Sequence, residues 1–247
     1  MQGLILAAGA SRRLYPLTKK IPKCLLEIGG MTILSHQLKA LKNHSINEVI
    51  IVLGYYKDKI IDYLNQNHSE MKFSFIINEQ YQDTNTSYSA FLCRDLLTSS
   101  DILLMNGDVL YPSLLLKQVI DSKHETVFAV DIKECGDDEV KVIVNNHKQI
   151  ISISKELPLK ESLGEFIGVA KLSASFCKYF VTSLSKLIDE GGKSDYFEAA
   201  IDPILNFQDV YYEDISHFPC IEIDFKEDLQ KANELVKDKL YLSLIHI

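Results

Sequence analysis

The sequence lacks paired cysteines and long apolar runs. Its five cysteines stand singly, with no CxxC pair, so they indicate neither a disulfide framework nor a zinc site. No run approaches the roughly 20 apolar residues of a membrane span, and no positively charged lead precedes the apolar start MQGLILAAGA. We therefore expect a soluble, untargeted cytoplasmic protein without membrane insertion.

Acidic residues are absent from the first 26 positions, although the formal net charge is −8. An even spread of the 34 acids would place about three or four of them there. The stretch instead carries five basic residues: Arg12, Arg13, Lys19, Lys20 and Lys23. The overall charge argues against nucleic acid as a partner, because nonspecific binding depends on clustered Lys and Arg. A small polyanion fits the acid-free stretch.

Four familiar ligand-binding or catalytic patterns are also absent. The N-terminal loop contains only Gly9, whereas a Walker loop or a dinucleotide fingerprint requires further glycines at fixed spacing. The seven histidines show no metal-ligand spacing, and no Ser, His and Asp set is suggested. ATPase and dehydrogenase functions are disfavoured accordingly.

The pattern that is present predicts an α/β fold. Apolar strands over 3–7, 48–53, 72–77 and 101–105 alternate with helices over 32–42, 57–67 and 86–97, which is typical of a parallel sheet. Further strands are expected near 126–132, 139–145, 149–154, 165–172, 210–213 and 220–224, with helices near 175–190, 195–205 and 226–240. We expect a single domain over 1–247, with a lid or insert over about 132–205.

The segment LILAAGASRRLYPLTKKIPKCL joins a strand end to a loop of small residues. Small residues let backbone amides approach an anion closely, while Pro16 and Pro22 restrict the loop. An arginine such as Arg13 can fork two phosphate oxygens, and Lys23 offers a compact point charge. A solvated surface loop is the alternative for any one of these residues. Their combination favours phosphate binding.

Two aspartates follow apolar strands. Asp108 ends DILLMNGD, and Asp224 lies in CIEIDF. Ligands of open α/β sheets bind at the carboxyl ends of strands, and Mg²⁺ is usually held by one or two carboxylates together with phosphate oxygens. An aspartate that only stabilises a turn is the alternative for Asp108 alone. The pair indicates a magnesium site.

The string AAGASRRLYPLTKKIPKCL resembles the signature of the nucleotidyltransferases that activate sugar phosphates and phospho-alcohols, roughly a small-residue turn, R(L/M)xPxT and PKxL. The resemblance implies a Rossmann-like, glycosyltransferase-A-like fold with a mostly parallel central sheet. It implies that Arg13 grips a triphosphate, that Lys23 bridges the reacting phosphates and that Asp108 and Asp224 hold Mg²⁺. It assigns nucleotide contacts to Leu6, Ala7, Ala8 and Gly9, and no role to Arg12.

The block YQDTNTSYSAF is similar to the TNxxYS stretch of cytidylyltransferases such as those that activate phosphocholine. By this resemblance Asn85, Thr86 and Ser87 bind the nucleotide, and CTP is the expected donor. Polar residues before a helix also serve as caps, and the residues alone favour neither role.

The resemblance further places Lys155, Glu165, Tyr196 and Glu198 around the acceptor. Lys155 is expected to contact the acceptor phosphate, Glu165 to lie near the polar head, and the Tyr196 segment to belong to the lid. From the residue types alone, each would be a solvated polar residue.

The sequence thus predicts a cytidylyltransferase that transfers CMP from CTP to a small acceptor and releases pyrophosphate. The acceptor is phosphocholine-like, a phosphonate, a phosphopolyol or a phospho-amino acid, and the product a precursor of cell-surface polysaccharide or phospholipid. A sugar-1-phosphate nucleotidylyltransferase using UTP or dTTP is the alternative within the class, and a noncatalytic nucleotide sensor the alternative outside it. The acceptor stays open, and so does a homo-oligomeric state.

Overall fold

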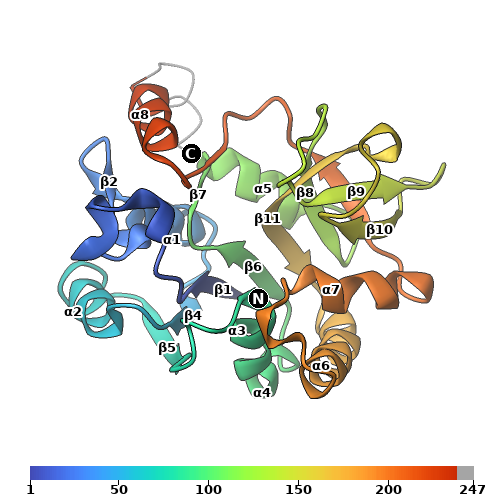
Figure 1. Ribbon diagram of the computed structural model, residues 1–247, viewed down its shortest axis with the longest axis horizontal. Coiled ribbons are helices and arrows are strands. Elements are labelled where there is room, and N and C mark those ends of the chain that lie inside the picture. Colours follow the sequence, from blue (N-terminus) through green and yellow to red (C-terminus); the bar gives the residue numbers. More distant parts are fainter. Residues whose placement is uncertain (238–247) are drawn as a thin grey trace. The chain divides into compact units, whose positions relative to one another are not determined.

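A computed structural model describes residues 1–237 (Figure 1). Contacts within the chain divide it into two compact units. Among the described residues, the first unit consists of residues 2–82, 105–117 and 218–237, and the second consists mainly of residues 83–104 and 118–217. Each unit is considered by itself.

The first unit is built on three parallel strands: β1 (Gln2–Ala7), β4 (Glu48–Leu53) and β5 (Lys72–Ile77). β4 pairs with β1 from Gly3↔Val49 to Ala7↔Leu53, and with β5 over its whole length. Helices α1 (Ile33–Asn43) and α2 (Lys57–Asn67) connect the strands, and Thr32 caps α1 by accepting a hydrogen bond from Ser35 N. These elements lie where the sequence predicts them, so the strand ends carrying the candidate residues are aligned.

Shorter elements complete the first unit. The hairpin of β2 (Glu27–Ile28) and β3 (Met31–Thr32) turns through Gly29 and Gly30, both at positive φ. β7 (Val109–Leu110) pairs with β13 (Ile221–Glu222) in antiparallel fashion, and α8 (Lys226–Leu235) follows. The sequence did not predict β2, β3 or β7, because two-residue strands are too short for a period to show. The expected end of the last helix near Leu240 lies outside the described residues.

The second unit contains a mainly antiparallel sheet. Its strands are β8 (Val127–Asp131), β9 (Lys141–Val144), β10 (Ile150–Ser154), β11 (Gly164–Leu172) and β12 (Tyr211–Asp214). β11 pairs antiparallel with β8 and β9, β10 pairs antiparallel with β9, and β12 pairs parallel with β8. The strands agree with those predicted.

The helices of the second unit are α3 (Thr86–Leu92), α4 (Arg94–Leu97), α6 (Ala174–Asp189) and α7 (Glu198–Ile201). The predicted helix over 86–97 is interrupted at Cys93. The predicted helix near 195–205 consists of α7 and a 3₁₀ turn over Asp202–Asn206, which contains a proline at its start.

Two elements contain the boundary between the units. Strand β6 (Ile102–Asn106) is fully buried from Ile102 to Met105, as expected for a strand covered on both faces. α5 (Ser113–Asp121), which the sequence analysis did not predict, begins in the first unit and ends in the second. None of the helices within residues 1–237 combines the length and apolar character needed to cross a membrane.

Candidate active site

The basic loop after β1 is tied down at several points of the first unit. Ser11 adopts the left-handed conformation, at φ 47°, and its carbonyl accepts a hydrogen bond from Thr18 Oγ1 at 2.8 Å. The hydroxyl of Tyr55 donates to Thr18 O at 2.9 Å, and that of Tyr56 donates to Lys19 O, also at 2.9 Å. The loop is therefore fixed by hydrogen bonds from side-chain hydroxyls to its backbone carbonyls, while the side chains of Arg12 and Arg13 are exposed.

The strand end from Leu6 to Gly9 is packed against two glycines that the sequence analysis did not single out. Gly107 N donates to Leu6 O at 3.0 Å, and a Cβ on Gly107 would lie 2.8 Å from that oxygen. A Cβ on Gly54 would lie 2.7 Å from Ala8 O. Only glycine permits these approaches. A Cβ on Gly9 would meet nothing within 4 Å, so this side of the loop has room for a ligand.

A hydrophobic cluster in the first unit positions the charged candidates. It contains the buried residues Leu14, Leu26, Ile28, Ile33, Leu110, Ile223, Ala232 and Val236. Leu14 directly follows Arg13 in the chain, and Ile223 directly precedes Asp224. The backbone at each charged residue is thus anchored by a neighbour in the core, which limits the backbone freedom that must be lost on binding.

Four predicted residues converge on one point. Lys23 Nζ lies 2.8 Å from Asp108 Oδ2 and 2.9 Å from Asp224 Oδ1, and Arg13 Nη2 lies 2.7 Å from Asp224 Oδ2. The pairing of β7 with β13, together with a hydrogen bond from Ile223 N to Asp108 O at 3.0 Å, brings the two aspartates together. Asp228 Oδ2 accepts hydrogen bonds from Asp224 N and Phe225 N and so orients the second aspartate.

Lys23 is held as an ammonium ion. Burial alone would lower its pKa, but the charges and hydrogen bonds of Asp108 and Asp224 outweigh that effect and raise the pKa of Lys23. The Lys23 side chain is 10% exposed, whereas that of Arg13 is 58% exposed. The positive charge of Lys23 is fixed, and Arg13 can reach a ligand.

Three carboxylates could hold a divalent metal ion. Asp108, Glu222 and Asp224 each offer an oxygen, and these oxygens lie within 4.8 Å of one another. Asp108 Oδ1 is buried and has no hydrogen-bond partner within residues 1–237. Three hard oxygen donors and one unsatisfied carboxylate oxygen fit the preferences of Mg²⁺. Sequence analysis missed Glu222, although the strand predicted near 220–224 would place it on the same face as Asp224.

The predicted nucleotide-binding block forms the start of α3 in the second unit. Asn85 caps the helix through a hydrogen bond from Thr86 N to its Oδ1 at 2.8 Å. Thr86 Oγ1 accepts from Phe197 N at 3.0 Å, and buried Ser87 donates to Gly192 O at 2.7 Å. All three residues thus have structural partners, and two of them anchor the segment from Gly192 to Phe197. Their contact with a nucleotide stays a prediction.

Lys155, Tyr196 and Glu198 line one cavity of about 240 Å³ in the second unit. The Lys155 ammonium lies 4.3 Å from the centre of the Tyr196 ring, a cation–π contact. Glu198 is 4% exposed, and burial raises its pKa to about 7 despite the opposing effects of its own backbone and Lys155. Three of the four residues predicted to bind the acceptor therefore share a single cavity.

Glu165 lies in a different cluster of the second unit. Its carboxylate is 2.7 Å from Lys133 Nζ, which also pairs with Glu139 at 3.0 Å and Asp131 at 3.6 Å. Burial raises the pKa of Glu165, and Lys133 opposes this rise. Among the described residues, Glu165 is not part of the cavity lining that contains Lys155. Its predicted contact with the polar head of the acceptor stays a prediction.

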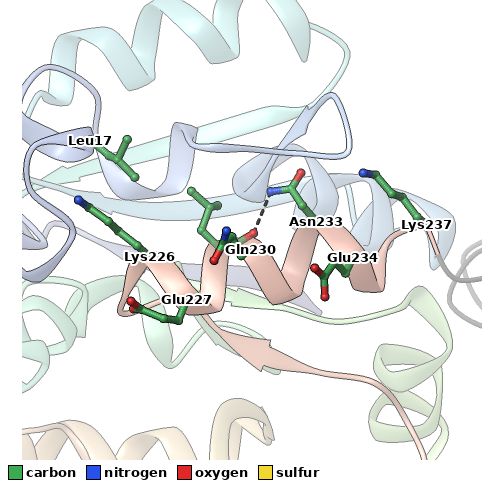
Figure 2. Close-up of a pocket in the computed structure, with 8 residues that line it drawn as sticks. Leu17, Lys226, Glu227, Gln230, Asn233, Glu234 and Lys237 are labelled. Carbon is green, nitrogen blue, oxygen red and sulfur yellow. Dashed lines mark hydrogen bonds between the residues drawn. The ribbon is translucent and has the colours of Figure 1, made fainter.

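A broader hollow of about 690 Å³ lies between Leu17 and α8 in the first unit (Figure 2). Asn233 on its wall donates a hydrogen bond to Leu229 O at 2.8 Å. The hollow is lined by charges of both signs: two lysines, Lys226 and Lys237, and two glutamates, Glu227 and Glu234. Such a surface offers no net positive charge to a polyphosphate, so size alone does not make it the active site.

Comparison with known proteins identifies the class. The family model described as "Nucleotidyl transferase" matches residues 2–155, and the chain belongs to this family. The matched segment includes Arg13, Lys23, Asp108 and the block around Asn85. The resemblance noted in the N-terminal signature is thereby confirmed.

Two relatives refine the comparison. The chain is 27% identical over 243 residues to the choline-phosphate cytidylyltransferase of Streptococcus pneumoniae, covering 97% of this chain and 100% of the relative. It is 31% identical over 193 residues to the CTP:phosphoglutamine cytidylyltransferase of Campylobacter jejuni, covering 71% and 74%. The predicted similarity to the cytidylyltransferase branch is confirmed.

A solved structure confirms the fold class. The structure of CTP:phosphocholine cytidylyltransferase from Streptococcus pneumoniae matches with a TM-score of 0.78 at 24% identity, covering 95% of this chain and 98% of that one. The α/β fold with a mostly parallel central sheet is therefore that of a nucleotidyltransferase.

Proposed function

We propose that this chain transfers CMP from CTP to a small phosphorylated or phosphonate acceptor and releases pyrophosphate. The observation that carries the proposal is the position of Lys23, which is fixed by ion pairs to both Asp108 and Asp224, with Arg13 on the same Asp224. This arrangement combines positive charge for phosphates with carboxylates for a metal ion. The relatives named for CTP supply the donor nucleotide.

In the proposed reaction, an oxygen of the acceptor phosphate attacks the α-phosphorus of CTP. The new P–O bond forms as the bond from the α-phosphorus to the bridging oxygen breaks, and that oxygen leaves with pyrophosphate. The nucleophile is already ionised near neutral pH, so no general base is required. The barrier comes from bringing two anions together in line, which orientation and fixed positive charge lower.

Each residue has a part in this scheme. Leu6, Ala7, Ala8 and Gly9 offer backbone to the nucleotide, with the open space beside Gly9 admitting it. Arg13, whose side chain is 58% exposed, holds the leaving pyrophosphate, and Lys23 offsets charge between the reacting phosphates. Asp108 and Asp224, with Glu222, would hold Mg²⁺, which supplies further positive charge to phosphate oxygens when bound. Asn85 and its neighbours contribute to recognition of the cytosine.

The acceptor is assigned to the second unit, where Lys155 contacts its phosphate and Tyr196 and Glu198 line the same cavity. Glu165 is assigned to the polar head of the acceptor on the basis of the family resemblance. The product would be a cytoplasmic precursor of a cell-surface polysaccharide or phospholipid. The assignments of Lys155, Tyr196 and Glu198 are supported by their shared cavity, while those of Glu165 and of the product rest on the family resemblance.

The test is pyrophosphate release by the purified protein with Mg²⁺, offered CTP, UTP or dTTP in turn with a panel of phosphorylated amines, polyols, amino acids, phosphonates and sugar 1-phosphates. We expect release only with CTP and at least one acceptor that is not a sugar 1-phosphate. Release with UTP or dTTP and a sugar 1-phosphate would assign the chain to the alternative reaction. Nucleotide binding without any release would indicate a sensor.

A further inference from the structure

The cavity around Lys155 is built mainly from two parts of the second unit that are tied together, with Val140 as a further lining residue. One wall comes from the end of β10 and the residues after it, and the other from the segment over 194–199. Asp202 Oδ1 accepts hydrogen bonds from Ser152 Oγ and Ile153 N, both at 2.7 Å, which fixes β10 to the turn after α7. Phe197, 1% exposed, anchors the second wall in the core. The lining is therefore set before a ligand arrives.

The lining contains two groups that favour different ligand groups: the Lys155 ammonium favours an anion, and the Glu198 carboxyl favours a hydrogen-bond donor. The Lys155 ammonium lies over Tyr196 and can pair with a phosphate. Glu198 Oε2 is buried and has no hydrogen-bond partner within residues 1–237. A buried carboxyl oxygen without a donor costs free energy, and a ligand N–H would satisfy it. Glu156 and Asp195 also line this cavity, and their acidic side chains favour a cation or a neutral hydrogen-bond donor over a second anion.

The number of aromatic side chains in the lining restricts which head group of an acceptor the cavity can recognise. Tyr196 is the one aromatic side chain that lines the cavity among the described residues. A quaternary ammonium group is recognised by several aromatic faces and has no N–H to donate. Neither property matches a cavity with one ring and an unsatisfied carboxyl oxygen.

We propose that the acceptor carries an N–H group, as an amine or a primary amide, that hydrogen-bonds to Glu198 while its phosphate or phosphonate pairs with Lys155. This inference rests on the proposed function and specifies its acceptor. It excludes alkyl phosphates without a polar head and N-trimethylated compounds as good substrates. The cavity of about 240 Å³ limits the acceptor to a small molecule.

The first experiment uses the wild-type protein with CTP and Mg²⁺. Aminoalkyl and amide-bearing alkyl phosphates and phosphonates of two to four carbons are each compared with an N-methylated counterpart that has no N–H, and with the alkyl phosphate lacking a head group. We expect kcat/KM for the best N–H compound to exceed that of its matched counterparts by about 10-fold or more. Equal turnover of a matched pair, or turnover only with acceptors that lack N–H, would overturn the inference. No turnover with any acceptor would instead contradict the proposed cytidylyl transfer.

The second experiment ties this preference to Glu198. Glu198→Gln and Glu198→Leu are compared with Glu161→Gln, which changes an exposed glutamate in the same unit. We expect Glu198→Leu to raise the KM of the N–H acceptor about 10-fold or more, with a smaller effect in Glu198→Gln, whose amide oxygen still accepts a hydrogen bond. The KM for CTP should stay within about twofold. A purely structural role would lower the yield of folded protein but leave the preference for N–H over its methylated counterpart unchanged in the folded fraction.

Discussion

Asp108 and Asp224 are far apart in the sequence but are joined at the backbone, because Ile223 N donates a hydrogen bond to Asp108 O at 3.0 Å. The residues next to this hydrogen bond also pair, because β7 and β13 form an antiparallel ladder. Lys23 Nζ is within 2.9 Å of both carboxylates. A fixed cation between two fixed anions leaves little reorganisation for the moment of reaction, which is the basis of electrostatic preorganisation.

Asp108→Asn is expected to remove most turnover while leaving the fold nearly intact. The amide keeps the shape of the side chain but loses the charge, so we expect kcat to fall about 100-fold or more. Lys23 retains Asp224 as a partner, so the free energy of unfolding should fall by only about 1 to 2 kcal/mol. Pyrophosphate release and urea unfolding measure the two effects. Asp189→Asn, at an exposed position, serves as control; near wild-type activity of Asp108→Asn would reject the assignment.

Glu222→Gln is expected to weaken metal binding more than it affects folding. Glu222 is exposed and contributes one of three clustered oxygens, so its removal should raise the Mg²⁺ concentration for half-maximal activity about 10-fold. Binding of Mn²⁺ followed by electron paramagnetic resonance, without acceptor, provides a readout independent of turnover. Glu227→Gln, an exposed neighbour, should behave like the wild type. Unchanged Mn²⁺ affinity in Glu222→Gln would remove it from the site.

Much of the fold was predictable because its long elements have clear periods. The bounds of β4, α2 and β5 agree with the sequence prediction, since apolar residues recur there at strand or helix spacing. A strand near 220–224 was predicted and contains β13, but its pairing with β7 was not, because the two residues of β7 show no period and the two strands are distant in sequence. The convergence of Lys23 with the aspartates was expected from resemblance and depends on that pairing.

The candidate site likewise contains residues that a sequence motif predicts and residues that depend on contacts between distant positions. Arg13, Lys23, Asp108 and Asp224 were found by motif, whereas Glu222 was not, because it belongs to no recognised motif and lies in a strand of only two residues. The roles of Thr86 and Ser87 as anchors for 192–197 depend on contacts across more than 100 positions. No local pattern encodes such contacts.

Ser87→Ala is expected to destabilise the second unit. Ser87 is fully buried, and its hydroxyl donates to Gly192 O at 2.7 Å, so the alanine leaves a carbonyl without that donor. The expected loss is about 1 to 2 kcal/mol in the free energy of unfolding. Urea unfolding measures it, with Ser99→Ala, at the end of an exposed turn, as control. A stability equal to that of the wild type would show that the segment near Gly192 is held by other contacts.

Glu198 should give the stability of the protein a pH dependence without any ligand. Burial raises its pKa in the folded state to about 7 from 4.5, so the folded state keeps a proton that the unfolded state releases first. Its contribution is therefore fully present below pH 4.5 and is lost as the pH rises through about 7. The shift corresponds to about 3 kcal/mol.

The glutamine of Glu198→Gln cannot titrate, so comparing it with the wild type separates the pH dependence due to Glu198 from that of other groups. Lys155, Glu156 and Asp195 face the same cavity and are unchanged in the variant. We expect the difference in unfolding free energy between wild type and Glu198→Gln to move in favour of the variant as the pH is raised from 5 to 8, by an amount on the order of 2 to 3 kcal/mol. Urea unfolding across this range measures the difference. A constant difference would mean that Glu198 is ionised in the folded protein throughout, and that the cavity supplies a compensating charge before any acceptor binds.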